Sequence, residues 1–353
     1  MKKILVINPG ATSTKFAIFA GETLQLDETV QHLVQELRCF ERVVDQCQYR
    51  LDLILQGLSH ANIPLTQLDA IVARGGLLKP LTGGTYAVNE SMLNDLRHAR
   101  RGEHASNLGA LIADILVKKL GIPGYIVDPV SVDELEPVAR ISGLPELPRI
   151  SMVHALNSKA VARKAARIIG KNYEDVNLVI AHLGTGISVT PHCKGRMIDV
   201  NNALEEGPFS PDRCGGLPAR SLAKLCYSGQ YTEQQLLSKM SGLGGMFAYL
   251  GTKDLREAER MADAGDEQAQ LVLDAMAYQV VKEIGAMAAV LGGKVDRIVL
   301  TGGMAYSTLL VNAIKEKVNF IAPIHVFPGE EEMEALAAGA LRVITGQEQA
   351  LVY

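Results

Sequence analysis

A stretch near the start of the chain has a counterpart in the second half, and this repetition limits the possible folds more than any other feature. Residues 4–16 read ILVINPGATSTKF, and residues 178–190 read LVIAHLGTGISVT. Each stretch is an apolar run, a polar turn with glycine and a second apolar run. Strand-like runs joined by such a turn are typical of β-hairpins. The sequence therefore predicts one strand-turn-strand unit in each half of the chain.

A second pair of similar segments follows in the same order. Residues 69–76 read DAIVARGG, and residues 296–303 read DRIVLTGG. One short likeness could arise by chance, but two likenesses in matching order favour a duplication. We expect two copies of one unit, paired about a pseudo-twofold axis, with both glycine turns facing a shared central cleft.

The segments between these marks alternate between strand-like and helix-like patterns, which is typical of an α/β protein with mixed sheets. A short strand is expected at 126–127, and helices are expected at residues 105–120, 151–169, 271–291 and 333–345. The long helix 271–291 is nearly apolar, so we expect it to be largely buried.

The segment 145–148 contains two prolines and is the expected domain junction. The first domain would then be residues 1–148, completed by the C-terminal segment 333–353. The second domain would be residues 149–332.

Composition excludes several classes of protein. The 353 residues carry a net charge of −4 and no tryptophan, which argues against nucleic acid as a partner. Five cysteines without C-x-x-C spacing predict neither disulfides nor a zinc knuckle and favour a reducing cytoplasm. No apolar run approaches the roughly 20 residues that a membrane span needs. The apolar run after Met1 is too short for a signal peptide.

The first polar turn has the side chains that an anion site needs. It combines the amide of Asn8, the ammonium of Lys15 and the hydroxyls of Thr12, Ser13 and Thr14. Bound phosphate takes such donors and a positive charge. The alternative is a tight turn at Asn-Pro-Gly with Lys15 as a solvated edge charge. The chain has neither a P-loop motif nor the glycine pattern of a dinucleotide-binding turn.

These segments together resemble the acetate and sugar kinase, Hsp70 and actin superfamily. Residues 181–186, AHLGTG, resemble a motif of the acetate kinase family, and residues 73–90 and 102–113 resemble its butyrate kinase branch. The likeness runs from Ile4 to the glutamates near residue 330. It implies two duplicated domains of the actin-like ATPase (ribonuclease H-like) type, with ATP/ADP and Mg²⁺ as cofactors. It also implies reversible phosphorylation of butyrate to butyryl phosphate by direct in-line transfer.

The resemblance assigns catalytic roles to two arginines and a histidine. Arg74 would contact the acyl carboxylate or the transferring phosphoryl group, and Arg213 would stabilise charge on the phosphoryl oxygens. Around Arg213 this chain reads Asp-Arg-Cys-Gly, where the family usually has Thr-Arg-Ser-Gly. His182 would donate a hydrogen bond to the phosphoryl group. The alternatives are a surface arginine near a turn for Arg74 and a structural histidine for His182.

The resemblance also implies two sets of nucleotide contacts. Asn8, Ser13 and Lys15 match the family's first phosphate loop, in which Ala11 replaces a common serine. The residues implied for the second phosphate turn and for the nucleoside are Gly184, Thr185, Gly186, Thr301, Gly302 and Gly303.

For the metal, the resemblance implies Asp128, which would also act in catalysis, and Glu331. Glu330 and Glu332 remain open as alternatives to Glu331, and the run could also be a plain acidic helix start. His104 resembles a further active-site histidine, but its spacing to Asn107 differs by one residue.

Three alternatives to a butyrate kinase stay open. The substrate could be propionate or a branched acid such as isobutyrate, because one methylene changes binding by only ~1–3 kcal/mol. The protein could be a non-catalytic, ATP-gated regulatory protein of the same superfamily. It could also be a sugar kinase, which needs an aspartate base for a hydroxyl. The resemblance further implies a homodimer or higher homo-oligomer.

Overall fold

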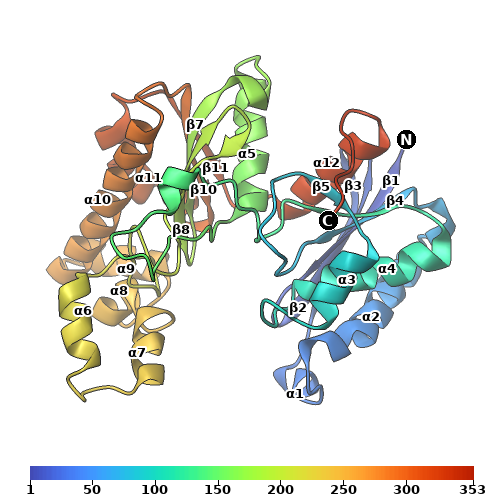
Figure 1. Cartoon of the computed structure of the whole chain (residues 1–353), viewed down its shortest axis with the longest axis horizontal. Helices are drawn as coiled ribbons and strands as arrows, with labels where there is room; N and C mark the ends of the chain where they lie inside the picture. Colours follow the sequence, from blue (N-terminus) through green and yellow to red (C-terminus); the bar gives the residue numbers. More distant parts are fainter. The chain divides into compact units, whose positions relative to one another are not determined.

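The computed structural model describes all residues from Met1 to Tyr353 and divides them into two compact units. The first unit is Met1–Val132 with Glu331–Tyr353, and the second unit is Asp133–Glu330. Each unit contains one β-sheet with helices around it (Figure 1). The predicted α/β class is confirmed.

The first unit is built on a six-stranded sheet in the order β3-β2-β1-β4-β6-β5. Strands β1, β4 and β6 run parallel. Strand β2 pairs antiparallel with β1, β3 pairs antiparallel with β2, and β5 pairs antiparallel with β6. The strands are β1 (Lys3–Pro9), β2 (Ser13–Ala20), β3 (Thr23–Gln31), β4 (Ala70–Arg74), β5 (Thr85–Ala87) and β6 (Gly124–Val127).

The second unit repeats this design in a five-stranded sheet, which reads β9-β8-β7-β10-β11 from its antiparallel edge. Again a hairpin (β7 and β8) is followed by parallel strands (β10 and β11). The strands are β7 (Asn177–Leu183), β8 (Ile187–Cys193), β9 (Arg196–Met197), β10 (Arg297–Gly302) and β11 (Ile324–Pro328). Both predicted hairpins and the duplication of the unit are therefore confirmed.

Helices cover both faces of the first sheet. On one face, α2 and α4 pack against alternate residues such as Leu5, Ile7 and Ile71. On the other face, α12 contacts β1, β4 and β6, and it lies beside the first strands although it ends the chain (Figure 1). The helical segments are α1 (Val34–Leu37), η1 (Val43–Gln46), α2 (Cys47–His60), η2 (Leu65–Gln67), α3 (Glu90–Arg97), α4 (Asn107–Leu120) and α12 (Glu332–Ile344).

The second sheet is covered in the same way. Its larger core joins the sheet to α10 and α11, whereas α5 packs on the opposite face against Leu178, Ile180 and Val299. The helical segments are η3 (Pro137–Arg140), α5 (Ala155–Ile168), η4 (Tyr173–Asp175), α6 (Ala219–Cys226), α7 (Glu233–Met240), α8 (Gly245–Leu250), α9 (Leu255–Asp263), α10 (Glu267–Val290), η5 (Gly303–Tyr306) and α11 (Thr308–Val318).

The helix predictions hold with two corrections. Helices α4, α10 and α12 match the predicted ranges closely, but α5 begins only at Ala155 rather than at Ser151. The ring of His154, just before α5, stacks on that of His182, which fixes a non-helical entry to the helix. Helix α10 is not largely buried: Leu271 and Tyr278 are exposed, so only one face of this apolar helix packs on the sheet.

Residues 133–148, which we expected to end the first domain, lie with the second unit. A buried ion pair holds them there: Lys159 Nζ on α5 lies 2.9 Å from Glu134 Oε2, and both side chains are at most 4% exposed. Glu134 also accepts a hydrogen bond from the amide of Met197 at 2.7 Å. A buried ion pair of this kind is hidden from sequence patterns because its partners lie far apart in the chain.

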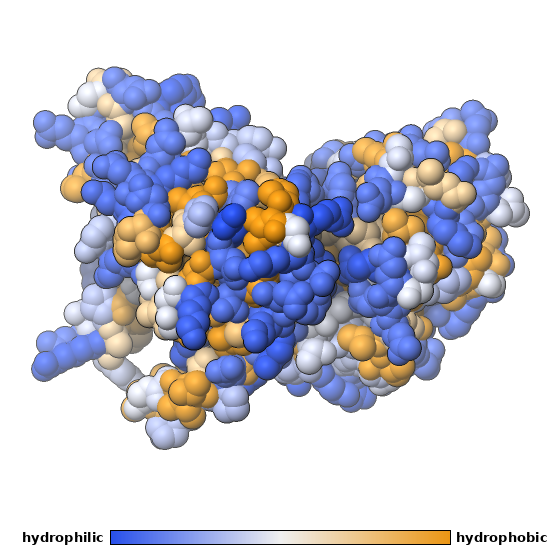
Figure 2. Space-filling model, turned by 90° about the horizontal axis from the view of Figure 1, so that it is seen from above, coloured by the Kyte–Doolittle hydropathy of each residue, from blue (hydrophilic) through white to orange (hydrophobic).

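No helix of the protein is long and apolar enough to cross a membrane. Polar residues cover most of the face seen in Figure 2, and apolar residues form smaller, separate patches on it. Scattered apolar patches of this kind are normal on a folded surface.

The Glu134–Lys159 pair yields a stability prediction. Glu134→Gln leaves the ammonium of Lys159 buried without its counter-charge, so we expect a loss of about 3–5 kcal/mol in the free energy of unfolding. The double variant Glu134→Gln/Lys159→Met removes the charge as well and should lose less. Urea unfolding of the two variants measures the difference. Equal losses would show that the buried charge is not the cause.

Candidate functional site

Three predicted site residues lie together at one edge of the first sheet. The ends of β1, β4 and β6 meet there because these strands are parallel and in register, with Ile7 beside Ala73 and Arg74 beside Val127. Asn8, Arg74 and Asp128 therefore stand at successive strand ends. Ligands of open α/β sheets bind at this carboxyl edge.

Asn8, Arg74 and Glu332 form a polar cluster at this edge. Asn8 Nδ2 donates a hydrogen bond to Glu332 Oε2 at 2.7 Å, and Arg74 Nη1 lies 3.2 Å from the same oxygen. Arg74 Nη1 is also 3.5 Å from Asn8 Oδ1. Arg74 thus presents its guanidinium group to a carboxylate that is only partly exposed, a geometry that suits oxyanion binding.

The backbone after Arg74 is tightly constrained. Gly109 of α4 lets the helix approach the carbonyl oxygen of Arg74, where any Cβ would clash. The amide of Leu77 donates to Asn107 Oδ1 at 2.8 Å, which holds the Gly75-Gly76 turn against the start of α4. The position of Arg74 is therefore fixed by backbone packing rather than by its own side chain.

Asp128 is buried and has a positive φ of 38°, an uncommon conformation for a residue other than glycine. Its Oδ1 accepts a hydrogen bond from the amide of Gly84 at 2.7 Å, and its own amide donates to the carbonyl of Gly84 at 3.0 Å. Strained backbone of this kind clusters at functional sites.

The first glycine turn lies beside this cluster. In the β1–β2 ladder Asn8 pairs with Lys15, so both side chains project from the same face of the sheet. Lys15 is exposed, and Ser13 is half-buried at the start of β2. The turn thus offers an ammonium group and a hydroxyl group next to Asn8.

His104 lies within electrostatic reach of Arg74. Its Nδ1 is 2.7 Å from Ser106 Oγ. Although part of the side chain reaches solvent, surrounding protein atoms lower the pKa of His104, and the positive charge of Arg74 lowers that pKa further. The structure therefore brings His104 toward the first-unit cluster despite the shifted spacing in the sequence.

The equivalent edge of the second sheet carries His182. It stands at the end of β7 beside Thr301 of β10, and its side chain is 1% exposed. Its Nδ1 is 2.9 Å from Asn157 Oδ1, and its ring stacks on His154 with centroids 3.9 Å apart. Its Nε2 lies 3.1 Å from Glu330 Oε1, at an angle that forms no hydrogen bond. Asn157 thus holds the His182 ring at Nδ1, and His154 covers one face of the ring.

Arg213 packs on the turn that follows His182. A Cβ on Gly186 would collide with the guanidinium of Arg213, and a Cβ on Gly184 would lie 2.9 Å from His182 Nε2. The loop of Arg213 is tied to this turn because Ser210 Oγ donates to the carbonyl of Thr185. Glycine at these two positions therefore leaves the space that the side chains of Arg213 and His182 occupy.

The Thr301-Gly302-Gly303 turn closes the same edge. Gly302 has a φ of 90° and exchanges two backbone hydrogen bonds with Gly329. A Cβ on Gly302 would clash with the carbonyl oxygen of Leu183. Gly303, by contrast, has open space around the Cβ position, so a ligand could approach its backbone.

The three consecutive glutamates have different surroundings. Glu330 faces His182 in the second unit, and Glu332 binds Asn8 and Arg74 in the first. Glu331 is exposed and directly precedes α12. Among the three, Glu332 is the one that joins the first-unit cluster.

The protein contains no group of three or more histidine, cysteine, aspartate or glutamate side chains that could hold a metal ion by themselves. Mg²⁺ commonly binds through one or two carboxylates, with water and phosphate oxygens completing its shell. The carboxylates of Asp128 and of the glutamate run supply hard oxygen ligands, so they suit such a site only together with a bound phosphate.

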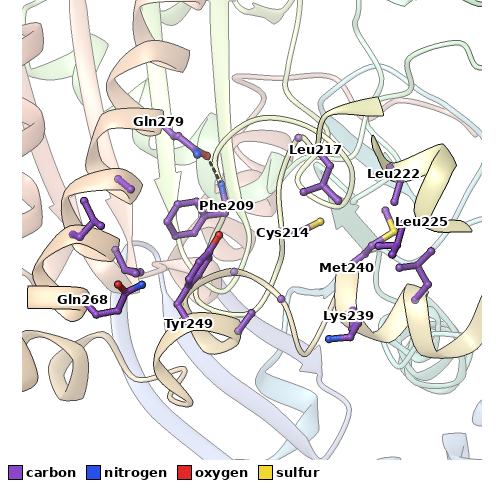
Figure 3. Close-up of a pocket in the computed structure, with 18 residues that line it drawn as sticks. Phe209, Cys214, Leu217, Leu222, Leu225, Lys239, Met240, Tyr249, Gln268 and Gln279 are labelled. Atoms are coloured by element: carbon purple, nitrogen blue, oxygen red, sulfur yellow. Dashed lines mark hydrogen bonds between the residues drawn. The ribbon is translucent and has the colours of Figure 1, made fainter. Parts of the chain in front are cut away.

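The loop of Arg213 borders an apolar pocket of about 610 Å³ in the second unit (Figure 3). Phe209 and Cys214 line it from this loop, and leucines of α6 and α7 line it from the other side. The amide of Phe209 donates to Gln279 Oε1 at 3.0 Å, which anchors the loop to α10. The loop therefore has polar contacts with the second glycine turn and apolar surroundings behind it.

Sequence reasoning missed Arg50, Asn157 and His154. Arg50 lies beneath the first glycine turn, and the other two hold His182. A signal existed for Arg50, since Leu51, Ile54 and Leu58 mark its side of α2 as the buried face. No comparable signal existed for Asn157.

The His104–Arg74 interaction can be tested by titration. Arg74→Gln removes a positive charge that lowers the pKa of His104, so this pKa should rise in the variant. Arg74→Lys keeps the charge and should keep the pKa low. NMR titration of the His104 ring measures both. An unchanged pKa in Arg74→Gln would show that the two side chains do not interact.

Comparisons with known proteins fit this arrangement. The sequence pattern of the Acetokinase family matches residues 149–339. The chain is 53% identical to "Butyrate kinase 2" of Clostridium acetobutylicum and 50% identical to a "Probable butyrate kinase" of Clostridium botulinum (strain Alaska E43), each over 99% of both chains.

Solved structures show the same fold at low sequence identity. Acetate kinase of Porphyromonas gingivalis matches with a TM-score of 0.80 and 19% identity, over 98% of this chain and 100% of that chain. A propionate kinase of Francisella tularensis matches with a TM-score of 0.76 and 18% identity, over 96% of this chain and 99% of that chain. Together with the two half-identical relatives, these matches show that the chain belongs to the acetokinase family.

Proposed function

We propose that this protein is a butyrate kinase, which transfers the γ-phosphoryl group of ATP to the carboxylate of butyrate and catalyses the reverse reaction. The observation that carries the proposal is the Arg74 cluster. There a guanidinium group at the carboxyl edge of the first sheet already binds a carboxylate, that of Glu332, at 3.2 Å. A short-chain carboxylate could take the same donors. The half-identical, full-length relatives named as butyrate kinases support this choice of acid.

The proposed reaction is a direct in-line transfer. One carboxylate oxygen of butyrate attacks the γ-phosphorus, the bond from phosphorus to the bridging oxygen breaks, and ADP leaves with the electron pair. A carboxylate is already deprotonated, so no general base is needed. The protein must instead position three anionic groups and offset their charge. We assign the acid to Arg74 and the phosphoryl oxygens to Arg213.

His182 would donate a hydrogen bond to the phosphoryl group. Asn157 Oδ1 lies 2.9 Å from its Nδ1, and the ring of His154 covers one face, so Nε2 is the ring nitrogen that remains for the phosphoryl group.

The remaining site residues would hold ATP. We propose phosphate contacts from Asn8, Ser13 and Lys15 in the first unit and from the turn 184–186 in the second, with the nucleoside at Thr301-Gly302-Gly303. This arrangement requires the two sheet edges to face the same cleft, which stays a prediction. Mg²⁺ would bind Asp128 and Glu331, with Glu332 as the alternative, and would offset the charge of the phosphates.

The alternatives differ in support. Propionate and isobutyrate remain close competitors, because no residue described here distinguishes one methylene. A sugar kinase has less support: a putative N-acetylmannosamine kinase of Listeria monocytogenes and a ROK hexokinase of Thermus thermophilus share the fold at only 13% and 17% identity. A non-catalytic regulatory protein would have no need for Arg74 beside a carboxylate site.

A cytoplasmic location agrees with five free cysteines, and a homo-oligomeric state stays a prediction.

An acid panel tests the proposal. ADP release from Mg-ATP would be measured with acetate, propionate, butyrate, isobutyrate and glycerol, and hydroxylamine would trap any acyl phosphate. We expect trapped product to peak at four-carbon acids and to vanish in Arg213→Ala and Arg74→Ala. ATP binding without acid-dependent product would instead support the regulatory protein.

The Arg213 loop gives a second prediction. Gly245 has a φ of 59°, and a Cβ there would clash with the carbonyl of Ser210 and lie 2.6 Å from that of Arg213. Gly245→Ala should displace this loop and lower kcat about 10–100-fold. Gly251→Ala is the matched control, because Gly251 has a φ of 73° but no atom within 4 Å of the Cβ position. Equal kcat values in the two variants would contradict the proposed role of the loop.

A further inference from the structure

Arg50 is the largest fully buried side chain in the protein, and the proposed reaction does not use it. It lies on α2 and is 1% exposed. A fully buried arginine is rare unless its charge is paired. Its surroundings therefore need an explanation.

The guanidinium group of Arg50 lies directly beneath the first glycine turn. Its Nη1 donates to the carbonyl oxygens of Gly10 at 2.8 Å and Ser13 at 2.9 Å. Its Nη2 donates to the carbonyl oxygen of Ala11 at 3.2 Å. The Arg50 side chain thus binds three of the four carbonyl groups of the turn 10–13, and these three point toward α2.

Arg50 forms no ion pair with any carboxylate. Its other partners are neutral: Nε and Nη2 donate to Gln46 Oε1 at 3.1 and 2.8 Å, and Nη1 donates to Thr14 Oγ1 at 3.0 Å. Burial lowers the pKa of Arg50, but an arginine keeps its proton in proteins. A full positive charge therefore remains under the turn.

The carbonyl contacts determine where the amides of the turn point. A peptide unit is planar and trans, so its N–H points away from its C=O. Because Arg50 draws the carbonyls of Gly10 and Ala11 inward, the amides of Ala11 and Thr12 point outward. These two amides form no hydrogen bond within the protein, and both residues are exposed. Ser13 and Lys15 follow in the chain, and Lys15 is also exposed.

A second contact holds the far end of the turn. The amide of His32 donates to the carbonyl of Thr12 at 2.8 Å, and His32 Nε2 lies 2.8 Å from Thr14 Oγ1. Thr14 Oγ1 in turn accepts from Arg50. All four carbonyl groups from Gly10 to Ser13 therefore accept hydrogen bonds from Arg50 or from the amide of His32.

We propose that Arg50 is a positioning residue for phosphate binding: it turns the amides of Ala11 and Thr12 outward as anion donors and places a buried positive charge beneath them. The ligand class is the phosphoryl oxygens of ATP and of the acyl phosphate. The proposal rests on the proposed phosphate site at Ser13 and Lys15. It adds to that site a charge and two backbone donors that no sequence motif indicates.

Gln46→Glu tests the buried positive charge of Arg50 while keeping the hydrogen bonds of its guanidinium group. The new carboxylate has the shape of the amide and accepts the same two hydrogen bonds from Arg50, so the turn keeps its support. It also neutralises the buried charge. We expect the Kd of Mg-ATP and the KM of butyryl phosphate to rise about fivefold or more, with the KM of butyrate changed by less than about twofold. The midpoint of thermal unfolding should not fall.

Gln48→Glu is the matched control, because it adds the same charge two residues further on, at an exposed position of α2. It should leave the Kd of Mg-ATP unchanged. Arg50→Lys keeps the positive charge but loses the guanidinium hydrogen bonds to the turn. It should also raise the KM of butyryl phosphate. This second variant tests the donor geometry if Gln46→Glu does not fold.

Two further variants separate this inference from the phosphate site on which it rests. If Ser13→Ala and Lys15→Met weaken Mg-ATP binding while Gln46→Glu and Arg50→Lys do not, Arg50 is only a structural residue and the inference is wrong. If none of the four weakens binding, the turn does not bind phosphate and both proposals are wrong. Weaker phosphate binding in all four supports both.

Discussion

The constraint on which the whole structure depends is that the central strands of both sheets are buried on both faces. In each unit the parallel strands pass between helices, so their side chains are almost all apolar. A polar group can reach a ligand only where these strands end. Asn8, Arg74 and Asp128 stand at such ends in the first unit, and His182 and Thr301 do so in the second. The position of the chemistry therefore follows from how the sheets are covered.

Close backbone approach is the second recurring device. Gly186 admits the guanidinium of Arg213, Gly109 admits the carbonyl of Arg74, and Gly302 admits that of Leu183. At Gly109 and Gly302 the missing Cβ lets two backbone segments approach more closely than any other residue allows. The rigid backbone then fixes the strand ends and turns that carry the functional side chains. Such a site is built mainly from main-chain geometry.

The sequence predicted the features that depend on local pattern. Hairpins, the duplicated unit and the helices α4, α10 and α12 follow from apolar periodicity and turn residues, and the structure confirms them. The extent of the first unit, the burial of Arg50 and the partners of His182 depend on contacts between distant residues. Lys159 and Glu134, for example, have ordinary sequence surroundings, and only the fold brings them together. The choice among Glu330, Glu331 and Glu332 depends on a helix start that periodicity locates only to within a few residues.

The return of α12 to the first sheet makes the first unit discontinuous in sequence, with the whole second unit inserted between its parts. During synthesis the second unit is complete while β1, β4 and β6 still lack the helix that covers one of their faces. Their apolar side chains on that face stay uncovered until α12 has been synthesised. The same helix brings Glu332 to Asn8 and Arg74. The docking of α12 therefore covers this face of the sheet and completes the carboxylate cluster at the same time.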